Sequence, residues 1–499
     1  MRPSSWPRLT SAALLLALAA TTASAGAKDA LPPEVAQALA RAKVPASSVA
    51  MLVAPLPPAP GATAAAPRLA WRADAPMSPA SVMKLVTTYA GLDLLGPGYF
   101  WKTRALAQGA VQDGALRGNL LIEGAGDPKL VRERIEDFLQ AILAKGVRRV
   151  DGDILLDRRV FSLPPHDAAR FDADPLRPYN AGPDGLLLNF KALVFKFTPD
   201  AASGRVRVAS EPPIADVAIA PDVPAAAGPC GNWRGKLAAG FDDPARVVFA
   251  GSYPASCGEQ SWGVAYADPE SYAPRVIEAM WQAAGGQLGG HVKWLTDGAA
   301  SGQPLVTEYS LPLAELIGDI NKFSNNVMAQ QLFLTLSVTP AQAGQAAQPG
   351  TFAASRAVLA RWWRQRLGPR VAAPTLENGS GLSRTERITA AALAALLAQA
   401  AGAGQAAAFE QSLPLAGVDD LAHGLAARNP ASEALGRARL KTGTLRDVTA
   451  VAGYVQGRSG QRYAVVGLIN HPNAPAARPA LDRLVEWAVR DDRAIASKK

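Results

Sequence analysis

Three short motifs lie far apart along the chain, and their order constrains the fold more than any other feature of the sequence. They are Ser81-Val82-Met83-Lys84, Ser324-Asn325-Asn326 and Lys441-Thr442-Gly443-Thr444. Either of the first two patterns arises readily by chance in a chain of 499 residues, whereas the ordered set is selective. If the motifs act together, the fold has to bring three elements to one cleft. These are the start of a helix for the first motif, a junction between helices for the second and a strand for the third.

The first motif pairs a hydroxyl with an amine. A serine hydroxyl is a weak nucleophile until a base removes its proton. Lys84 lies three residues after Ser81, so the two share a helix face with about 5–6 Å between Cβ atoms. An amine serves as a base when burial or a nearby cation lowers its pKa, and Lys441 is a candidate for that cation. The spacing therefore predicts Ser81 as a nucleophile and Lys84 as its base.

Local signals assign the motifs to particular elements. A helix is predicted over 79–95, with Ser78 as its cap. The second motif falls between two apolar helical stripes, 313–320 and 327–336, and can project polar side chains into a cleft. Read singly, the residues of the first motif could be ordinary helix residues and Asn326 a helix cap. The presence of all three motifs favours the functional interpretation.

The third motif continues a β-like run at 438–440. An edge strand there can hold a substrate by main-chain pairing. Gly443 lets the substrate backbone come close, because it has no side chain. Lys441, Thr442 and Thr444 suit a terminal carboxylate.

The segments between the motifs differ in character. Short β-like runs fill 186–270. Late in the chain, β-like runs at 448–455 and 463–469 flank a glycine-containing hairpin turn, and apolar residues at helical spacing follow near 481–488. These patterns predict a sheet that is covered on one face by the last helix.

The N-terminus has the features of a secretory signal. Arg2 and Arg8 give a positively charged start, and an apolar run at 12–20 follows. Ala23-Ser24-Ala25 is a cleavage pattern, so the mature chain is expected to begin at Gly26. The alternative is a membrane anchor, but the run is shorter than the roughly 20 residues that spanning requires. We therefore predict an exported protein.

Export makes the two cysteines informative. Cys230 and Cys257 are the only cysteines of the chain, and an oxidising compartment favours their pairing in a disulfide. Two separate buried thiols are the alternative.

The formal net charge of +9 fits peripheral association with anionic membrane or wall surfaces. The sequence has no nucleic-acid motif and no G-x-S-x-G, H-E-x-x-H or C-x-x-C pattern, which argues against triad hydrolases, zinc proteases and redox proteins.

Together the motifs resemble those of penicillin-binding proteins and serine β-lactamases. The interval from Ser81 to Ser324 is about twice as long as that from Ser324 to Lys441. Such an interval is similar to that of the low-molecular-mass class C penicillin-binding proteins. These are the D-alanyl-D-alanine carboxypeptidase/endopeptidases of peptidase family S13 (penicillin-binding protein 4 type), which carry a domain inserted there. The stretch 378–384 resembles the D-G-S-G-L-S-R motif of that family, with Asn378 in place of the acidic residue.

The resemblance implies catalytic roles for five residues. Ser81 would form the acyl-enzyme, and Lys84 would be its base. Ser324, assisted by Lys441, would relay a proton to the leaving amine. Asn326 would hydrogen-bond the amide of the substrate.

The resemblance also implies a substrate-binding strand. Thr442 and Thr444 would contact the carboxylate of a terminal D-Ala or of a penicillin, beside Gly443. The main-chain N–H groups of Ser81 and Thr444 would form the oxyanion hole. Arg384 would line the cleft.

For the whole chain, the resemblance implies an α/β (α+β) fold. A serine β-lactamase/transpeptidase-like domain would comprise 26–97 and 295–499, after a signal peptide at 1–25. A large, mainly β insertion would occupy 98–294, with a nested β subdomain near 190–270. The oligomeric state stays open.

The implied function is that of a periplasmic serine peptidase of peptidoglycan. It would remove terminal D-Ala or cleave D-configured cross-links, would be acylated by β-lactams and would need no metal or organic cofactor. One alternative is another hydrolase of the same superfamily: a D-aminopeptidase, an esterase or a β-lactamase-like enzyme. A further alternative is an inactive wall-binding scaffold.

Overall fold

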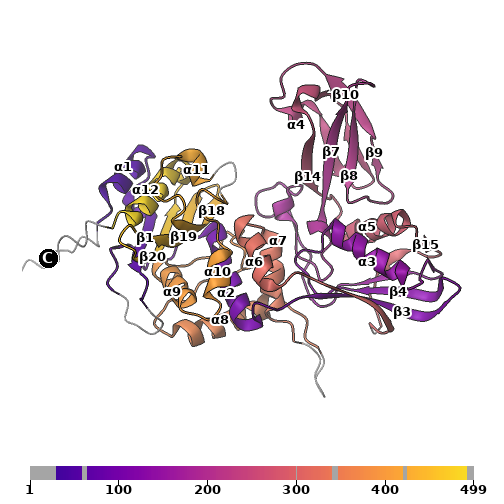
Figure 1. Ribbon diagram of the computed structural model, residues 1–499, viewed down its shortest axis with the longest axis horizontal. Helices are drawn as coiled ribbons and strands as arrows, with labels where there is room; N and C mark the ends of the chain where they lie inside the picture. The colour runs from indigo at the N-terminus through magenta and orange to yellow at the C-terminus, as the bar shows by residue number, and fades with distance from the viewer. Residues whose placement is uncertain (1–29, 59–64, 299, 340–346, 420–423, 492–499) are drawn as a thin grey trace, which may run out of the picture.

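The structure is a computed structural model that describes residues 30–58, 65–298, 300–339, 347–419 and 424–491. The expected signal segment lies outside these residues. Figure 1 shows the described chain as two bodies, one built around β1, β18, β19 and β20 and the other around β3, β4 and a tall group of strands. In the part of the chain that the structure describes, none of the helices combines the length and the apolar character that a membrane crossing requires.

The first body contains a five-stranded antiparallel sheet. Its strands, in spatial order, are β18 (Ala438–Leu445), β19 (Val448–Gln456), β20 (Arg462–Asn470), β1 (Val49–Pro55) and β2 (Leu69–Trp71). Almost every residue of β19 and β20 is buried, as expected for central strands that are covered on both faces. The late hairpin is therefore present as predicted, and β18 is an edge strand.

Helices cover both faces of this sheet. The side chains of β1 alternate between them: Ala50 and Leu52 belong to the core under α2 (Lys84–Leu95) and α9 (Ala390–Ala401), whereas Met51 packs on the opposite face. The opposite face is covered by α1 (Pro33–Arg41) and the predicted last helix, α12 (Arg478–Val489). The remaining helices of this body are α6 (Leu313–Lys322), α7 (Asn326–Thr335), α8 (Phe352–Leu367), α10 (Ala406–Gln411) and α11 (Leu425–Arg428).

The second body begins with a seven-stranded sheet. It is formed by β3 (Lys102–Gln112), β4 (Ala115–Glu123), β5 (Arg149–Val150), β6 (Ile154–Asp157), β15 (Gln287–Leu288), β16 (Val292–Trp294) and β17 (Gln303–Tyr309). Apolar side chains of α3 (Arg132–Ala144) and α5 (Pro269–Ala283) share one core with it. The expected end of the insertion at 294 falls before β17, although β17 pairs with β3 in the same sheet. The division of the chain into domains stays a prediction.

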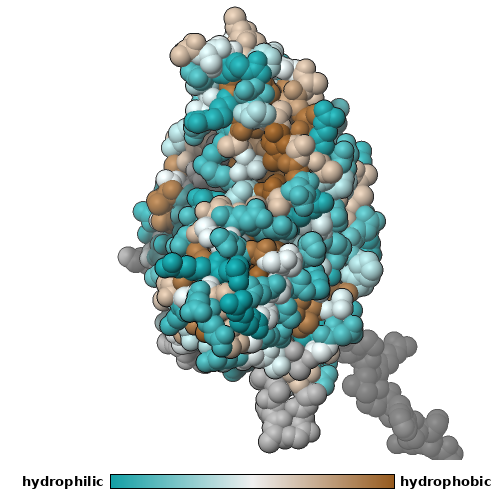
Figure 2. Space-filling model, turned by 90° about the vertical axis from the view of Figure 1, so that its right-hand side faces the viewer, coloured by the Kyte–Doolittle hydropathy of each residue, from teal (hydrophilic) through white to brown (hydrophobic). Residues whose placement is uncertain are grey.

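A smaller β unit rises from this body (Figure 1). Its five-stranded sheet consists of β13 (Tyr253–Pro254), β10 (Asp222–Ala226), β8 (Arg205–Glu211), β7 (Ala192–Asp200) and β14 (Gln260–Ala265). A three-stranded sheet of β11 (Ala239–Asp243), β12 (Arg246–Phe249) and β9 (Ala218–Ile219) accompanies it, together with the short helix α4 (Trp233–Lys236). Figure 2 shows this end of the molecule, where hydrophilic residues cover most of the surface and hydrophobic residues gather mainly in the upper half.

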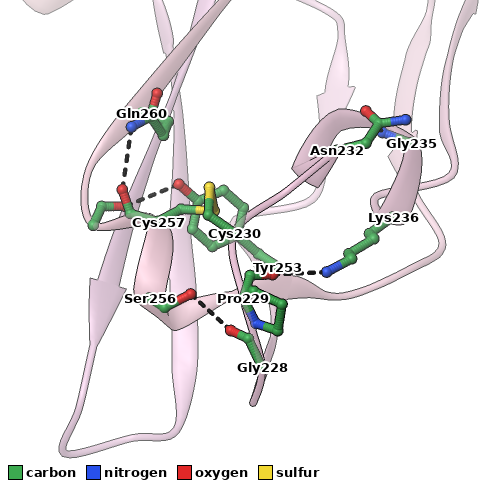
Figure 3. The surroundings of a disulfide bond; sticks show 11 residues. Gly228, Pro229, Cys230, Asn232, Gly235, Lys236, Tyr253, Ser256, Cys257 and Gln260 are labelled. Atoms are coloured by element: carbon green, nitrogen blue, oxygen red, sulfur yellow. Dashed lines mark hydrogen bonds between the residues drawn. A yellow bond between two sulfur atoms is a disulfide. The ribbon is translucent and has the colours of Figure 1, made fainter.

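The predicted disulfide between Cys230 and Cys257 lies in the smaller β unit (Figure 3). Hydrogen bonds connect the same two segments, since Ser256 donates to the carbonyl oxygen of Gly228 at 2.7 Å. The segments around Cys230 and Cys257 are therefore joined both by the disulfide and by a hydrogen bond.

Candidate active site

The segment that carries Ser81 begins as a 3-10 turn, η3 (Ala80–Met83), and continues into α2 at Lys84. The prediction that Ser78 caps this helix is wrong. The main chain of Ser78 is held by the side chain of Asn470, at the end of β20, through hydrogen bonds of 2.7 and 2.9 Å. The start of the helix is thus fastened to the sheet, and Ala80 has a left-handed backbone conformation, with φ of 47°.

The amine of Lys84 is completely buried and lies among three oxygen atoms. Its Nζ is 3.0 Å from the Oγ of Ser81, 2.6 Å from the Oδ1 of Asn326 and 2.6 Å from the carbonyl oxygen of Ser380. Burial lowers the pKa of Lys84 well below its ordinary value, and the positive charge of Lys441 lowers it further. A lysine in these surroundings can give up its proton and act as a base.

The second motif lies between α6 and α7, as predicted. Ser324 has a left-handed backbone conformation, with φ of 55°. The alternative that Asn326 caps the helix is wrong, because the side chain of Asn325 takes that place and accepts from the N–H of Met328 at 3.0 Å. Asn326 is consequently free to contact Lys84, and its amide nitrogen donates to the carbonyl oxygen of Tyr179 in the second body at 3.1 Å.

Lys441 connects the third motif with the second. Its buried Nζ donates to the Oγ of Ser324 at 2.9 Å and to the carbonyl oxygen of Thr442 at 2.7 Å. Burial lowers the pKa of Lys441 to about 7. Together with the contact between Lys84 and Asn326, this bond brings all three motifs into one connected group.

Gly443 and the two threonines of β18 lie beside η3. A Cβ added at Gly443 would lie 2.5 Å from the carbonyl oxygen of Pro79 and 3.0 Å from the main-chain nitrogen of Ser81. The expectation was that glycine makes room for a substrate. The close approach that the structure shows at Gly443 is to the turn that carries Ser81. Thr442 and Thr444 are exposed.

Arg384 lies at the edge of this group. Its guanidinium carbon is 4.3 Å from the ring centroid of Phe171, in the second body, and its Nη1 is 3.3 Å from a carboxylate oxygen of Asp447. The side chain is about half exposed, at 48%. Arg384 therefore bridges the two bodies near the site, and among the described residues its side chain forms no hydrogen bond or ion pair with the three motifs.

Sequence reasoning missed one buried acid, Glu386. Its carboxylate accepts hydrogen bonds of 2.8–3.0 Å from four main-chain N–H groups of the loop that holds Lys84. These belong to Glu377, Asn378, Gly379 and Gly381. Asn378 itself stabilises the loop, because its side chain bonds Ser380 and the carbonyl oxygen of Leu382. No pattern in the sequence marks Glu386, since its partners are main-chain groups.

Comparison of the chain with known proteins identifies a family. Residues 34–490 match the model of the D-Ala-D-Ala carboxypeptidase 3 (S13) family. The chain is similar to a D-alanyl-D-alanine carboxypeptidase of Actinomadura sp. (strain R39), with 29% identity over an alignment of 434 residues that covers 82% of this chain and 77% of the relative.

Solved structures share the fold. A crystal structure of penicillin binding protein 4 (dacB) from Haemophilus influenzae has a TM-score of 0.69 and 22% identity, covering 91% of this chain and 99% of that one. A second structure of that protein, complexed with a novel β-lactam, has a TM-score of 0.65 and 21% identity, covering 92% and 100%. These likenesses bear out the expected α/β transpeptidase-like fold. The match of the family model over 34–490 leads to one conclusion: the chain belongs to the D-Ala-D-Ala carboxypeptidase 3 (S13) family of enzymes.

Proposed function

We propose that the chain is an exported serine peptidase of peptidoglycan that removes terminal D-Ala, cleaves D-configured cross-links, or does both. The observation that carries the proposal is the connected group of Ser81, Lys84, Asn326, Ser324 and Lys441, in which each amine lies at hydrogen-bond distance from a serine hydroxyl. The family match over 34–490 supports the substrate class.

The reaction begins at Ser81. Lys84 takes the proton of the hydroxyl, and the Oγ attacks the carbonyl carbon of the terminal peptide bond. The main-chain N–H groups of Ser81 and Thr444 stabilise the negative charge that develops on the carbonyl oxygen. The C–N bond then breaks and leaves an ester on Ser81.

The leaving amine needs a proton. Ser324 donates one and regains it from Lys441, whose Nζ lies 2.9 Å from the Ser324 hydroxyl. Asn326 holds the amide of the substrate, and the hydroxyls of Thr442 and Thr444 bind its terminal carboxylate. Water then attacks the ester and gives up a proton, which passes through Ser324 to Lys441. Lys84 returns the proton that it took to the Oγ of Ser81, so both amines and the serine are restored. A penicillin enters the same steps through its lactam carbonyl and forms a stable ester.

The test is acylation of the purified mature chain by a labelled penicillin, followed by intact mass measurement and peptide mapping. A single adduct on Ser81 that disappears in Ser81→Ala supports the proposal. An adduct elsewhere contradicts the role of Ser81. No adduct in a folded chain contradicts the proposal and favours the hydrolase and scaffold alternatives. Release of D-Ala from wall peptides and cleavage of cross-linked dimers then separate the two peptidase activities from D-aminopeptidase, esterase and β-lactamase activities.

A further inference from the structure

The guanidinium of Arg478 lies beside the third motif. Arg478 is the first residue of α12, and its Nη2 donates to the Oγ1 of Thr444 at 2.7 Å. Thr444 comes from the edge strand β18 and is exposed. An arginine from the last helix of the chain therefore reaches the strand on which the proposed substrate carboxylate is bound.

The position of Arg478 is electrostatically unfavourable for a cation. Burial and the neighbouring Arg428 both lower its pKa, and Asp482 offsets them in part. The carboxylate of Asp482 is hydrogen-bonded to Arg428, at 2.7 and 3.0 Å. Within the described ranges, Arg478 forms no ion pair of its own. The N-terminus of a helix also disfavours positive charge. The guanidinium of Arg478 thus carries a positive charge beside Thr444 without an ion-pair partner among the described residues.

Arg478 lines a cavity of about 250 Å³ between α12 and the sheet. Thr442 and Thr449 line the cavity from the strands. The Oγ1 of Thr449 is buried and has no hydrogen-bond partner among the described residues. The charged residues of the described lining are Lys322, Arg428, Arg478, Asp419 and Asp482, which carry one more positive charge than negative. Counted over its described lining, the cavity thus has room, polar groups and one excess positive charge for an anion.

We propose that Arg478 makes the enzyme select acyl donors that end in a free carboxylate. This inference rests on the proposed function and adds the residue that sets its specificity. The hydroxyl of Thr444 accepts from Arg478, so its own proton is directed outward and can be donated to a carboxylate oxygen. The guanidinium charge behind the hydroxyl strengthens that bond. Arg478 acts through Thr444 and is therefore a positioning residue.

The experiment compares two probes, benzylpenicillin and its methyl ester, which differ in the carboxylate. The rate of acylation of Ser81 by each probe is measured by intact mass. In the wild-type chain, the free acid should react faster. In Arg478→Gln, the ratio of the two rates should fall roughly tenfold, which is the usual effect of losing a charge-assisted hydrogen bond. Arg478→Lys keeps the charge and should recover part of the ratio, which a purely structural role would not produce.

Arg483→Gln is the matched control. Arg483 lies on the same helix, is 51% exposed and bonds Glu486 rather than the cavity, so its loss should leave the ratio at the wild-type value. An unchanged ratio in Arg478→Gln overturns the inference while the proposed function stands. Failure of the wild-type chain to react with either probe overturns both. If Arg478→Gln does not fold, Arg478→Met removes the same charge and hydrogen bond while keeping an unbranched side chain, and an unchanged ratio there overturns the inference.

Discussion

The amine of Lys84 lies 2.6 Å from the side-chain oxygen of Asn326, although 242 positions separate the two residues along the chain. This contact joins the first motif to the second, and the 2.9 Å contact between Lys441 and Ser324 joins the second to the third. The large second body lies between the first two motifs in the sequence and does not separate them in space. Instead it contributes the carbonyl oxygen of Tyr179, which holds the amide of Asn326.

Replacing Glu386 by Gln should weaken both the loop and the base. Glutamine keeps the size of the side chain, but its amide nitrogen is a donor. It would face a main-chain N–H group that now donates to the carboxylate, so that hydrogen bond would be lost. We expect the free energy of unfolding to fall by about 2–3 kcal/mol. The carboxylate also raises the pKa of Lys84, so its loss should lower that pKa. The acid limb of the acylation rate against pH should then move to lower pH.

The control for this prediction is Glu377→Gln. The carboxylate of Glu377 accepts from the hydroxyls of Ser383 and Thr385, at 2.6 and 3.0 Å, on the outer side of the same loop. Its loss should leave the acid limb in place. An acid limb that stays fixed in Glu386→Gln, or that moves equally in both variants, contradicts the assigned role of Glu386.

Lys441 should make stability depend on pH. Its pKa in the folded chain is about 7, against an ordinary value of 10.5. Between these values the unfolded chain binds a proton that the folded chain does not, so the free energy of unfolding should rise with pH by about 1.4 kcal/mol per unit. Below about 7 both states bind the proton, and this contribution stops changing.

Denaturant unfolding of Lys441→Met measures this contribution. The variant lacks the titrating amine, so the difference between wild type and variant should shift in favour of the wild type from pH 7 to pH 9. The same substitution at the exposed Lys145 should show no such shift. A difference for Lys441→Met that is constant with pH would mean that the folded chain keeps the proton.

The motifs and the late hairpin could be predicted from sequence because each is local. The residues that hold the motifs in place could not. Asn325 and Asn326 are equally good helix caps by composition, and only the position of Lys84 decides which side chain turns inward. Ser78 is a residue type that often caps helices, but here its main chain is hydrogen-bonded to the distant side chain of Asn470. Glu386 binds main-chain groups and so leaves no pattern of side chains.

Removing the disulfide should lower the stability of the smaller β unit. The bond closes a loop between positions 27 residues apart. A loop of this length restricts the unfolded chain, so its removal should lower the free energy of unfolding by about 3–4 kcal/mol. We expect the double variant Cys230→Ser, Cys257→Ser to unfold at lower denaturant concentration. Acylation of Ser81 should be retained, because the disulfide lies in the second body. Loss of acylation in a folded double variant would contradict this separation.

Gly443→Ala should impair acylation more than it impairs folding. The added methyl group would lie 2.5 Å from the carbonyl oxygen of Pro79 and 3.0 Å from the nitrogen of Ser81. Both contacts are to main chain, so η3 has to move away from β18, and a displacement of about 1 Å at a reacting group can lower the rate about a hundredfold. Gly98→Ala is the matched control, because nothing lies within 4 Å of its added Cβ. The rate of penicillin acylation should fall in the first variant and stay at the wild-type value in the second. Equal rates in both variants would show that the close approach of strand and turn is not required for the reaction.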